Sequence, residues 1–211
     1  MGQIGHFQIA TRTIASEFVT TDWFDRPVLT GQHVRLEPLT EEHAAGLLEA
    51  GKDPAVWTWL GILRPTNLPE AQAMVAKTLA DPSRRAWVQI DAKTGEVAGT
   101  TSYYEIDPVH RGVYIGRTWI GSRWQRTGLN TDAKLMLMSR AFDVLGAHRV
   151  GWHTDMLNAK SRAAITRLGA TFEGALRSHR IRPDGTLRDT AVHSVTAPEW
   201  PSVREGLTSR N

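Results

Sequence analysis

The chain has 211 residues, of which 41% are hydrophobic and 22% are charged, as is ordinary for a globular protein with one sizeable core. Its 25 Lys and Arg residues against 22 Asp and Glu residues give a formal charge of +3, which permits an anionic ligand without requiring nucleic acid. Cysteine is absent, which excludes a disulfide framework, a thiolate zinc site and a cysteine nucleophile.

The sequence also predicts where the protein resides. No apolar run approaches the roughly 20 residues that a membrane-spanning helix needs. Residues 1–18 carry scattered polar side chains and lack the continuous apolar stretch of a signal peptide. We therefore expect a cytoplasmic protein without a membrane partner, which agrees with the absence of cysteine.

The predicted elements begin after residues 1–30, which we interpret as an N-terminal extension of mixed polarity. The pattern then predicts, in chain order, a strand (33–39), two helices (41–51 and 69–80), three strands (86–91, 97–106 and 113–120), a helix (131–145), a strand (149–154), a helix (158–169) and a hairpin (171–181 and 188–196). Such an order favours one α/β (α+β) domain over residues 31–200, with a mixed sheet of about seven strands and helices on both faces. Residues 201–211 are expected to form a C-terminal tail.

The segment Trp124–Asn130 is the most informative stretch, because it lies between a predicted strand and a predicted helix. A strand, a glycine turn and a helix start direct several backbone N–H groups to one point, where the helix adds its partial positive end. Arg123 and Arg126 add two cations. The turn is therefore predicted to bind an anion such as the pyrophosphate of a nucleotide-like cofactor. Taken alone, it could equally be an ordinary loop with solvated arginines.

The order of elements and the sequence Gln-Arg-Thr-Gly-Leu-Asn at 125–130 resemble the GCN5-related N-acetyltransferases, whose phosphate turn is usually written Q/R-x-x-G-x-G/A. Gln125 and Gly128 match this pattern, while Asn130 replaces the last small residue. The continuation 130–134, the stretch 158–165 and Glu173–Gly174 are similar to the branch related to the ribosomal-protein alanine acetyltransferases. The resemblance covers roughly residues 32–200.

This resemblance implies an acetyl-coenzyme A site in a V-shaped opening between the strands 113–120 and 149–154. The pantetheine arm would lie along the first of these strands, the pyrophosphate would contact the amides of the turn, and the start of the helix at 158 would hold the pantetheine and the sulfur. Glycine at 128 would let the backbone approach a phosphate closely. The implied cofactor residues are Thr118, Trp119, Ile120, Arg123, Gln125, Arg126, Thr127, Gly128, Leu129, Asn130, Asn158, Ser161 and Arg162.

Two side chains that many relatives use in catalysis are missing. The usual strand glutamate is Tyr114 here, and the usual helix tyrosine is Ile165. Ser161 is the best candidate for protonating the leaving thiolate. Among the candidate bases near the expected cleft, we choose His153, because the intrinsic pKa of histidine suits a base at neutral pH; a water relay is the alternative. The full set of candidate bases is Tyr103, Glu105, Tyr114, His153 and Asp155.

Several residues also have simpler interpretations. Asn158 can cap a helix, His153 can be an ordinary sheet residue, and Lys134 and Arg140 are expected to be charges on a helix surface. His148 and His153 lack the spacing of metal ligands, so no metal is predicted.

The sequence thus predicts an acetyl-coenzyme A-dependent N-acetyltransferase that transfers an acetyl group to a protein N-terminal amine or a small amine by direct attack in a ternary complex. The alternative is a protein of the same fold that binds coenzyme A without efficient catalysis. A nucleic-acid partner would rest only on the pI near 9.5 and is not predicted. A homodimer is considered, because the early extension and the final hairpin could support one.

Overall fold

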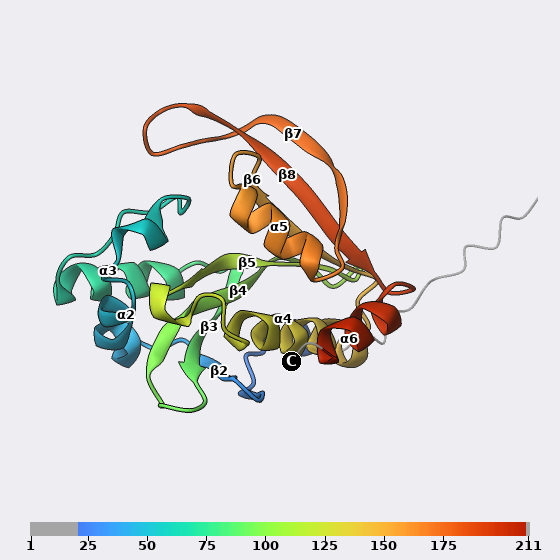
Figure 1. Ribbon diagram of the computed structural model, residues 1–211, viewed down its shortest axis with the longest axis horizontal. Helices are drawn as coiled ribbons and strands as arrows, with labels where there is room; N and C mark the ends of the chain where they lie inside the picture. The colour runs from blue at the N-terminus through green and yellow to red at the C-terminus, as the bar shows by residue number, and fades with distance from the viewer. Residues whose placement is uncertain (1–20, 210–211) are drawn as a thin grey trace, which may run out of the picture.

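The computed structural model describes residues 21–209 of the chain. Its centre is one sheet, whose strands lie in the spatial order β1-β2-β3-β4-β5-β6-β8-β7 (Figure 1). Only β5 and β6 run parallel among the described strands. The strands are β1 (Leu29–Thr30), β2 (Val34–Pro38), β3 (Arg84–Asp91), β4 (Val97–Asp107), β5 (Gly112–Ile120), β6 (Arg149–Asp155), β7 (Thr171–Ile181) and β8 (Leu187–Thr196).

Among the described residues, helices lie before the first strand, between strands and after the last one. The α-helices are α1 (Thr21–Phe24), α2 (Ala44–Ala50), α3 (Leu68–Leu79), α4 (Leu129–Ser139), α5 (Ala159–Arg167) and α6 (Trp200–Thr208). Three short 3-10 helices are η1 (Glu41–His43), η2 (Pro54–Trp57) and η3 (Ser122–Trp124), and the π-helix η4 (Arg140–Val144) continues α4. Within residues 21–209, no helix has the length and apolar character needed to span a membrane.

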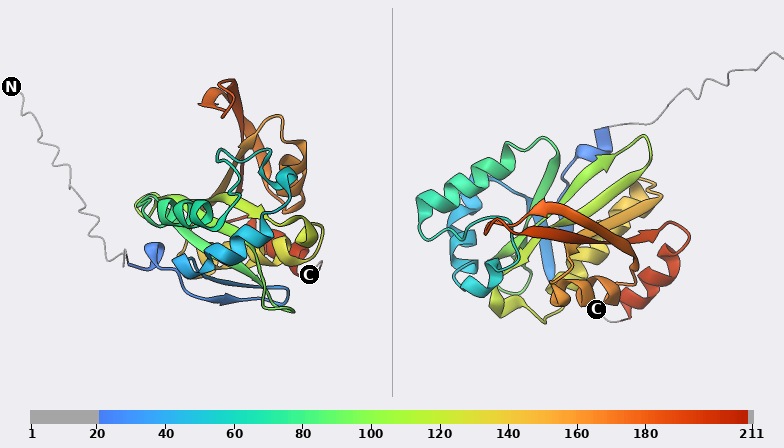
Figure 2. Two further views of the ribbon diagram at one scale, coloured as in Figure 1. Left: turned by 90° about the vertical axis from the view of Figure 1, so that its left-hand side faces the viewer. Right: turned by 90° about the horizontal axis from the view of Figure 1, so that it is seen from above.

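Helices cover both faces of the sheet. Tyr103 of β4 points to α4, because its hydroxyl donates to the carbonyl of Leu137. Its neighbour Ser102 points to the opposite face, as alternation along a strand requires, and there the Ser102 hydroxyl contacts Arg84 of β3. On that second face lie α2 and α3, which pack side by side (Figure 2). The hairpin β7–β8 rises beyond α5 at the other end of the sheet (Figure 1).

The prediction of one α/β domain with a mixed sheet is confirmed, and the sheet has one strand more than expected. The added strand is β1, which lies inside the predicted extension and pairs with β2. The rest of that extension up to residue 20 lies outside the described residues, but Trp23 is buried. The predicted tail also contains structure, because α6 buries Trp200 and Leu207 against the domain, and Trp200 stacks on Phe142.

A β-bulge interrupts the pairing of β4 with β5 at the middle of the sheet. Thr100 pairs with Trp119 and Ser102 pairs with Gly116, so Thr101 alone faces the two residues Arg117 and Thr118. Arg117 has a φ of +51°, in the left-handed region. A bulge of this kind leaves main-chain groups outside the ladder and redirects neighbouring side chains. It lies on the strand that the sequence analysis assigned to the pantetheine arm.

Candidate active site

Among the described residues, the turn between β5 and α4 contains backbone N–H groups without acceptors at the start of a helix. Arg126 adopts a left-handed φ of +64°, and the Thr127 hydroxyl donates to the carbonyl of Trp124 at 2.7 Å. The backbone amides of Arg126, Thr127 and Gly128 donate to no acceptor within residues 21–209. They are followed by the first turn of α4, where backbone N–H groups lack partners within the helix. Several N–H donors are therefore available at the positive end of a helix.

Packing also requires a glycine at position 128, in addition to the expected approach of the backbone to a phosphate. The φ of Gly128 is −63°, which any residue can adopt. A Cβ at this position would lie 2.4 Å from Cδ2 of the His33 ring. The absence of a side chain thus lets the start of β2 pack against the turn. Asp132 joins the same two elements, because its buried carboxylate accepts from the N–H groups of His33 at 2.6 Å and Val34 at 3.2 Å.

The polar side chains of the turn differ in their engagement. Arg123 forms an ion pair with Glu96 and lies 4.0 Å above the Trp124 ring. Gln125 donates to the carbonyl of Ile120 at 3.0 Å and accepts from Lys160, which ties the end of β5 to α5. Arg126 is exposed and has no ion-pair partner among the described residues. Of the two predicted arginines, Arg126 is therefore better placed to receive an anion.

The start of α5 confirms the cap and leaves polar groups available. The Asn158 side-chain oxygen accepts from the Ser161 N–H at 3.0 Å, as a helix N-cap does. Within residues 21–209, the Asn158 Nδ2 group and the Ser161 hydroxyl have no hydrogen-bond partner, and both residues are partly exposed. Arg162 is turned toward the protein, because it donates to the carbonyl of Met156 at 3.3 Å and lies 5.9 Å from the Phe172 ring.

The assigned segment of β5 is anchored from both faces of the sheet. The Thr118 hydroxyl contacts the Thr101 hydroxyl at 2.8 Å and accepts from Lys134 at 2.7 Å on the α4 face. Trp119 and Ile120 are buried, and the Trp119 ring lies 4.9 Å from the Trp57 ring of η2. The backbone of these residues is thereby held in one position.

The expectation that Lys134 and Arg140 are surface charges is wrong. Lys134 is 5% exposed and Arg140 is 6% exposed. Both lie on the side of α4 and η4 that faces the sheet, where Arg140 lies over the Tyr103 ring and Lys134 reaches the hydroxyls of Thr101 and Thr118. Burial without a carboxylate partner lowers the pKa of Lys134 to about 7.

The candidate bases do not all lie together. His153, Tyr114 and Glu105 form one cluster, in which the rings of His153 and Tyr114 are 4.4 Å apart and His153 Nδ1 is 3.8 Å from Glu105. Tyr103 is instead fully buried against α4, and burial raises its pKa, so it is not at the cleft. Asp155 is occupied by an ion pair with Arg182.

His153 has an environment that disfavours its charged form. Burial and the nearby His179 lower the pKa of His153 to about 4, and the cations Arg180, Arg188 and Arg149 add to this effect. At pH 7 the imidazole is therefore neutral and can accept a hydrogen bond. A pKa so far below the working pH also makes it a weak proton acceptor.

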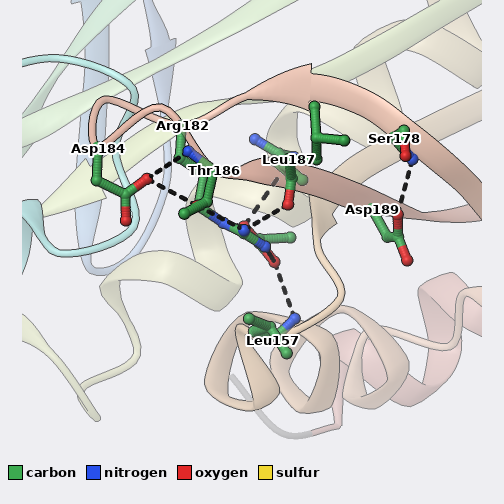
Figure 3. Close-up of polar contacts among 9 residues, drawn as sticks. Leu157, Ser178, Arg182, Asp184, Thr186, Leu187 and Asp189 are labelled. Atoms are coloured by element: carbon green, nitrogen blue, oxygen red, sulfur yellow. Dashed lines mark hydrogen bonds and ion pairs between the residues drawn. The ribbon is translucent and has the colours of Figure 1, made fainter.

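Asp155 links the hairpin to the residues that precede α5. Figure 3 shows Arg182 and Leu187 of the hairpin, with Leu157 below them. The Asp155 carboxylate accepts from Arg182 at 2.7 and 3.1 Å and from the Leu157 N–H at 2.9 Å. Arg182 in turn donates to the carbonyl of Leu187 at 2.6 Å and to the Thr186 hydroxyl at 3.1 Å. The hydrogen bond from Arg182 holds the pKa of Asp155 below its ordinary value. Its role is therefore structural and not that of a base.

We expect Asp155→Asn to lower the free energy of unfolding by about 2 kcal/mol, because the buried Asp155 side chain loses its charge-assisted hydrogen bonds from Arg182. The matched control is Asp184→Asn at the exposed tip of the same hairpin, which should change stability much less. Urea unfolding at pH 7 measures both. Because the folded-state pKa of Asp155 is lowered, its contribution is full above the ordinary Asp value and should vanish as the pH falls through the lowered pKa. Equal stability of the two variants would contradict this role.

Sequence reasoning missed Arg84, Arg117, Asp132 and Lys134 as residues that shape the site. Their contacts join elements that are distant in the chain, such as α4 with β2 and α4 with β5. The one local signal was for Asp132, which stands in the first turn of a predicted helix. Nothing in the local pattern indicates a bulge at Arg117.

Comparison with known proteins agrees with this architecture. The family described as "Acetyltransferase (GNAT) domain" matches residues 33–171. The uncharacterized N-acetyltransferase YoaA of Bacillus subtilis is 25% identical over 175 residues, which are 82% of this chain and 98% of that protein. A crystal structure of a GCN5-related N-acetyltransferase from Brucella melitensis is 32% identical with a TM-score of 0.84, covering 88% of this chain and 85% of that one.

A structure of Mycobacterium smegmatis RimJ in complex with CoA-disulfide shares the fold. It has 22% identity and a TM-score of 0.73, and the match covers 90% of this chain and 96% of that one. The family match spans most of the sheet, the turn at 125–130 and α5. The chain belongs to the GNAT N-acetyltransferases, in the RimJ/RimL-like family.

Proposed function

We propose that the protein transfers the acetyl group of acetyl-coenzyme A to a primary amine by direct attack in a ternary complex. The observation that supports this proposal is the turn at 126–130, which combines the backbone amides of Arg126, Thr127 and Gly128 without an acceptor, the N-terminus of α4 and an Arg126 side chain without an ion-pair partner among the described residues. A pyrophosphate has the charge and the acceptor oxygens that such a turn binds. Coenzyme A therefore fits the residues present.

The remaining cofactor residues take positions consistent with this assignment. The backbone of Thr118, Trp119 and Ile120 would hold the pantetheine arm beside the bulge, and Asn158 Nδ2 would bond its amide groups. The parallel pairing of β5 with β6 covers only Gly112–Tyr114 and Arg149–Gly151, which supports a V-shaped opening beyond those residues. When bound, acetyl-coenzyme A supplies the thioester whose carbonyl carbon accepts the amine.

The chain's own groups would then manage charge and protons. An N–H left outside the ladder at the bulge can stabilise the developing oxyanion. As the C–N bond forms and the C–S bond breaks, the Ser161 hydroxyl can deliver a proton to the sulfur, and the proton lost from the attacking nitrogen restores the hydroxyl. Because His153 is a weak proton acceptor, we assign removal of the ammonium proton to water beside His153 and Tyr114. Positioning supplies most of the remaining acceleration.

Three broader expectations stay predictions. They are the cytoplasmic location, the assembly into a homodimer and the boundaries of the domain at residues 31 and 200. The choice between a protein N-terminal amine and a small amine is taken up below.

The test is calorimetric titration with acetyl-coenzyme A, together with an assay of thiol release across a panel of amines. We expect Arg126→Ala to weaken binding about 10-fold or more, because it removes a charge-assisted contact to phosphate. Arg204→Ala is the matched control, since this arginine pairs with Asp143 near the far end of η4 and lies about 20 Å from the turn along the helix.

Three outcomes are distinguished by these measurements. Thiol release that depends on one amine supports a transferase. Binding of acetyl-coenzyme A without turnover of any amine favours the alternative, a coenzyme A-binding protein without catalysis. Absence of binding, or equal loss in both arginine variants, contradicts the assignment of the turn.

A further inference from the structure

A small cavity lies beside the bulge, on the face of the sheet that α2 and α3 cover. Its volume is about 60 Å³, and its lining is largely apolar, with Leu47, Ile62 and Met74 among the side chains. Two arginines, the half-buried Arg84 from β3 and the exposed Arg117 from β5, also line it. One water needs roughly 10–15 Å³ of cavity volume, so the cavity has room for a group of a few heavy atoms.

The two arginines bring positive charge to this cavity without a matching ion pair. Arg84 donates to the hydroxyls of Ser102 at 2.7 Å and Thr78 at 3.4 Å, and neither arginine forms an ion pair within residues 21–209. Burial and the nearby Arg117 lower the pKa of Arg84 to about 10, so Arg84 stays charged at pH 7. A mostly buried guanidinium is costly unless an anion accompanies it.

Asp81 is the carboxylate that acts on both arginines through space, but it is already engaged. It accepts from the Ser83 N–H at 3.0 Å and from the Ser83 hydroxyl at 2.6 Å. Hydrogen bonds from Ser83 account for most of the lowering of its pKa. Two cations against one occupied carboxylate leave the cavity with a net positive field.

The position of the cavity connects it to the transfer reaction. Arg117 occupies the bulge and immediately precedes Thr118, whose backbone is assigned to the pantetheine arm. Trp119, which follows Thr118 in β5, also lines the cavity. A molecule held by Arg84 and Arg117 would therefore lie next to the acetyl group if the proposed function is right.

We propose that this Arg84–Arg117 pocket binds the carboxylate of the amine acceptor, so that the acceptor is a small apolar amino acid and the product is its N-acetyl derivative. The proposal rests on the proposed function and names its substrate class. Guanidinium and carboxylate groups match in planar, bidentate hydrogen bonding. The apolar lining selects a hydrocarbon side chain, and the small volume disfavours a long peptide.

The test compares leucine with leucinamide, which differ only in the carboxylate, as acceptors in the thiol-release assay. We expect Arg117→Gln to lower the ratio of kcat/KM for leucine over leucinamide about 10-fold or more, mainly through a higher KM for leucine. Arg117→Lys should retain part of this preference, and Arg84→Lys tests the second guanidinium with its charge kept. Arg204→Gln is the control that leaves the ratio unchanged.

A second measurement does not depend on turnover. Calorimetry on protein saturated with coenzyme A should show tighter binding of N-acetylleucine than of N-acetylleucinamide, and Arg117→Gln should remove the difference. Equal binding of N-acetylleucine and N-acetylleucinamide overturns the proposal. An unchanged ratio of kcat/KM for leucine over leucinamide in Arg117→Gln overturns it as well. So does a preference for peptides without acidic groups as acceptors. If acetyl-coenzyme A binds and only neutral amines are acetylated, the proposed function stands and this inference fails.

Discussion

Lys134→Met is expected to raise the free energy of unfolding at pH 7 by about 3 kcal/mol or more, because the wild-type protein buries an ammonium group without a carboxylate partner. Methionine has a similar length and suits the apolar surroundings. The two hydroxyls that Lys134 contacts remain bonded to each other, since Thr101 and Thr118 lie 2.8 Å apart. Urea unfolding measures the change.

The stability difference between wild type and Lys134→Met should depend on pH, whereas a change in packing alone would not make it do so. The folded-state pKa of Lys134 is lowered to about 7, whereas the unfolded chain keeps the ordinary lysine value. Between these values the unfolded state binds more protons, so Lys134 makes wild-type stability rise with pH by up to about 1.4 kcal/mol per unit. Below the folded-state pKa both states are protonated and the penalty is constant.

The difference between wild type and Lys134→Met should therefore shrink as the pH rises from 7 to 9. Other titrating groups, such as the buried tyrosines, are common to both proteins and cancel in this difference. Lys77→Met on the exposed side of α3 is the control and should have little effect at either pH. Parallel pH profiles for wild type and Lys134→Met would show that the lysine is not perturbed.

Gly99→Ala is expected to lower the free energy of unfolding by about 3 kcal/mol or more, through a clash with backbone in the central sheet. A Cβ on Gly99 would lie 2.1 Å from the carbonyl oxygen of Trp119, on the paired strand β5. Its φ of +155° is also one that a side chain rarely adopts. Relief requires movement of β5 at the segment assigned to acetyl-coenzyme A, so binding of that molecule should weaken in parallel.

Two further glycines separate the clash from the backbone strain. Gly95 has a φ of +74° and no atom near its would-be Cβ, so Gly95→Ala should cost about 1 kcal/mol from strain alone. Gly112 has neither feature in the structure, and Gly112→Ala should be within about 0.5 kcal/mol of wild type. Thermal or urea unfolding of the three variants gives the comparison. Similar losses at Gly99 and Gly95 would mean that the carbonyl contact is not decisive.

Local pattern was sufficient where an element has an apolar face, as in α3, or where turn residues separate two strands, as in the hairpin. The helix predicted at 69–80 is observed as α3 over Leu68–Leu79, and the hairpin predicted at 171–181 and 188–196 is observed as β7 and β8. The helix α6 was not predicted, although Trp200, Val203 and Leu207 have helical spacing. Residues 201–211 were instead expected to form a tail. This helix is stabilised by packing on the π-helical segment η4, and the local sequence pattern does not predict that contact.

The turn at 125–130 and the helix cap at Asn158 could be predicted from the sequence, because residues that are neighbours in sequence determine backbone turns and helix starts. The sequence could not predict three features of the site. These are the burial of Lys134 and Arg140, the ion pair of Asp155 with Arg182 and the lowered pKa of His153. Each depends on which face of an element meets a distant partner, and on how much solvent that contact removes. The amino-acid sequence by itself thus determined the family and the position of the turn between β5 and α4, while only the tertiary structure decided which charges lie buried, since burial and electrostatic coupling arise from contacts between remote segments.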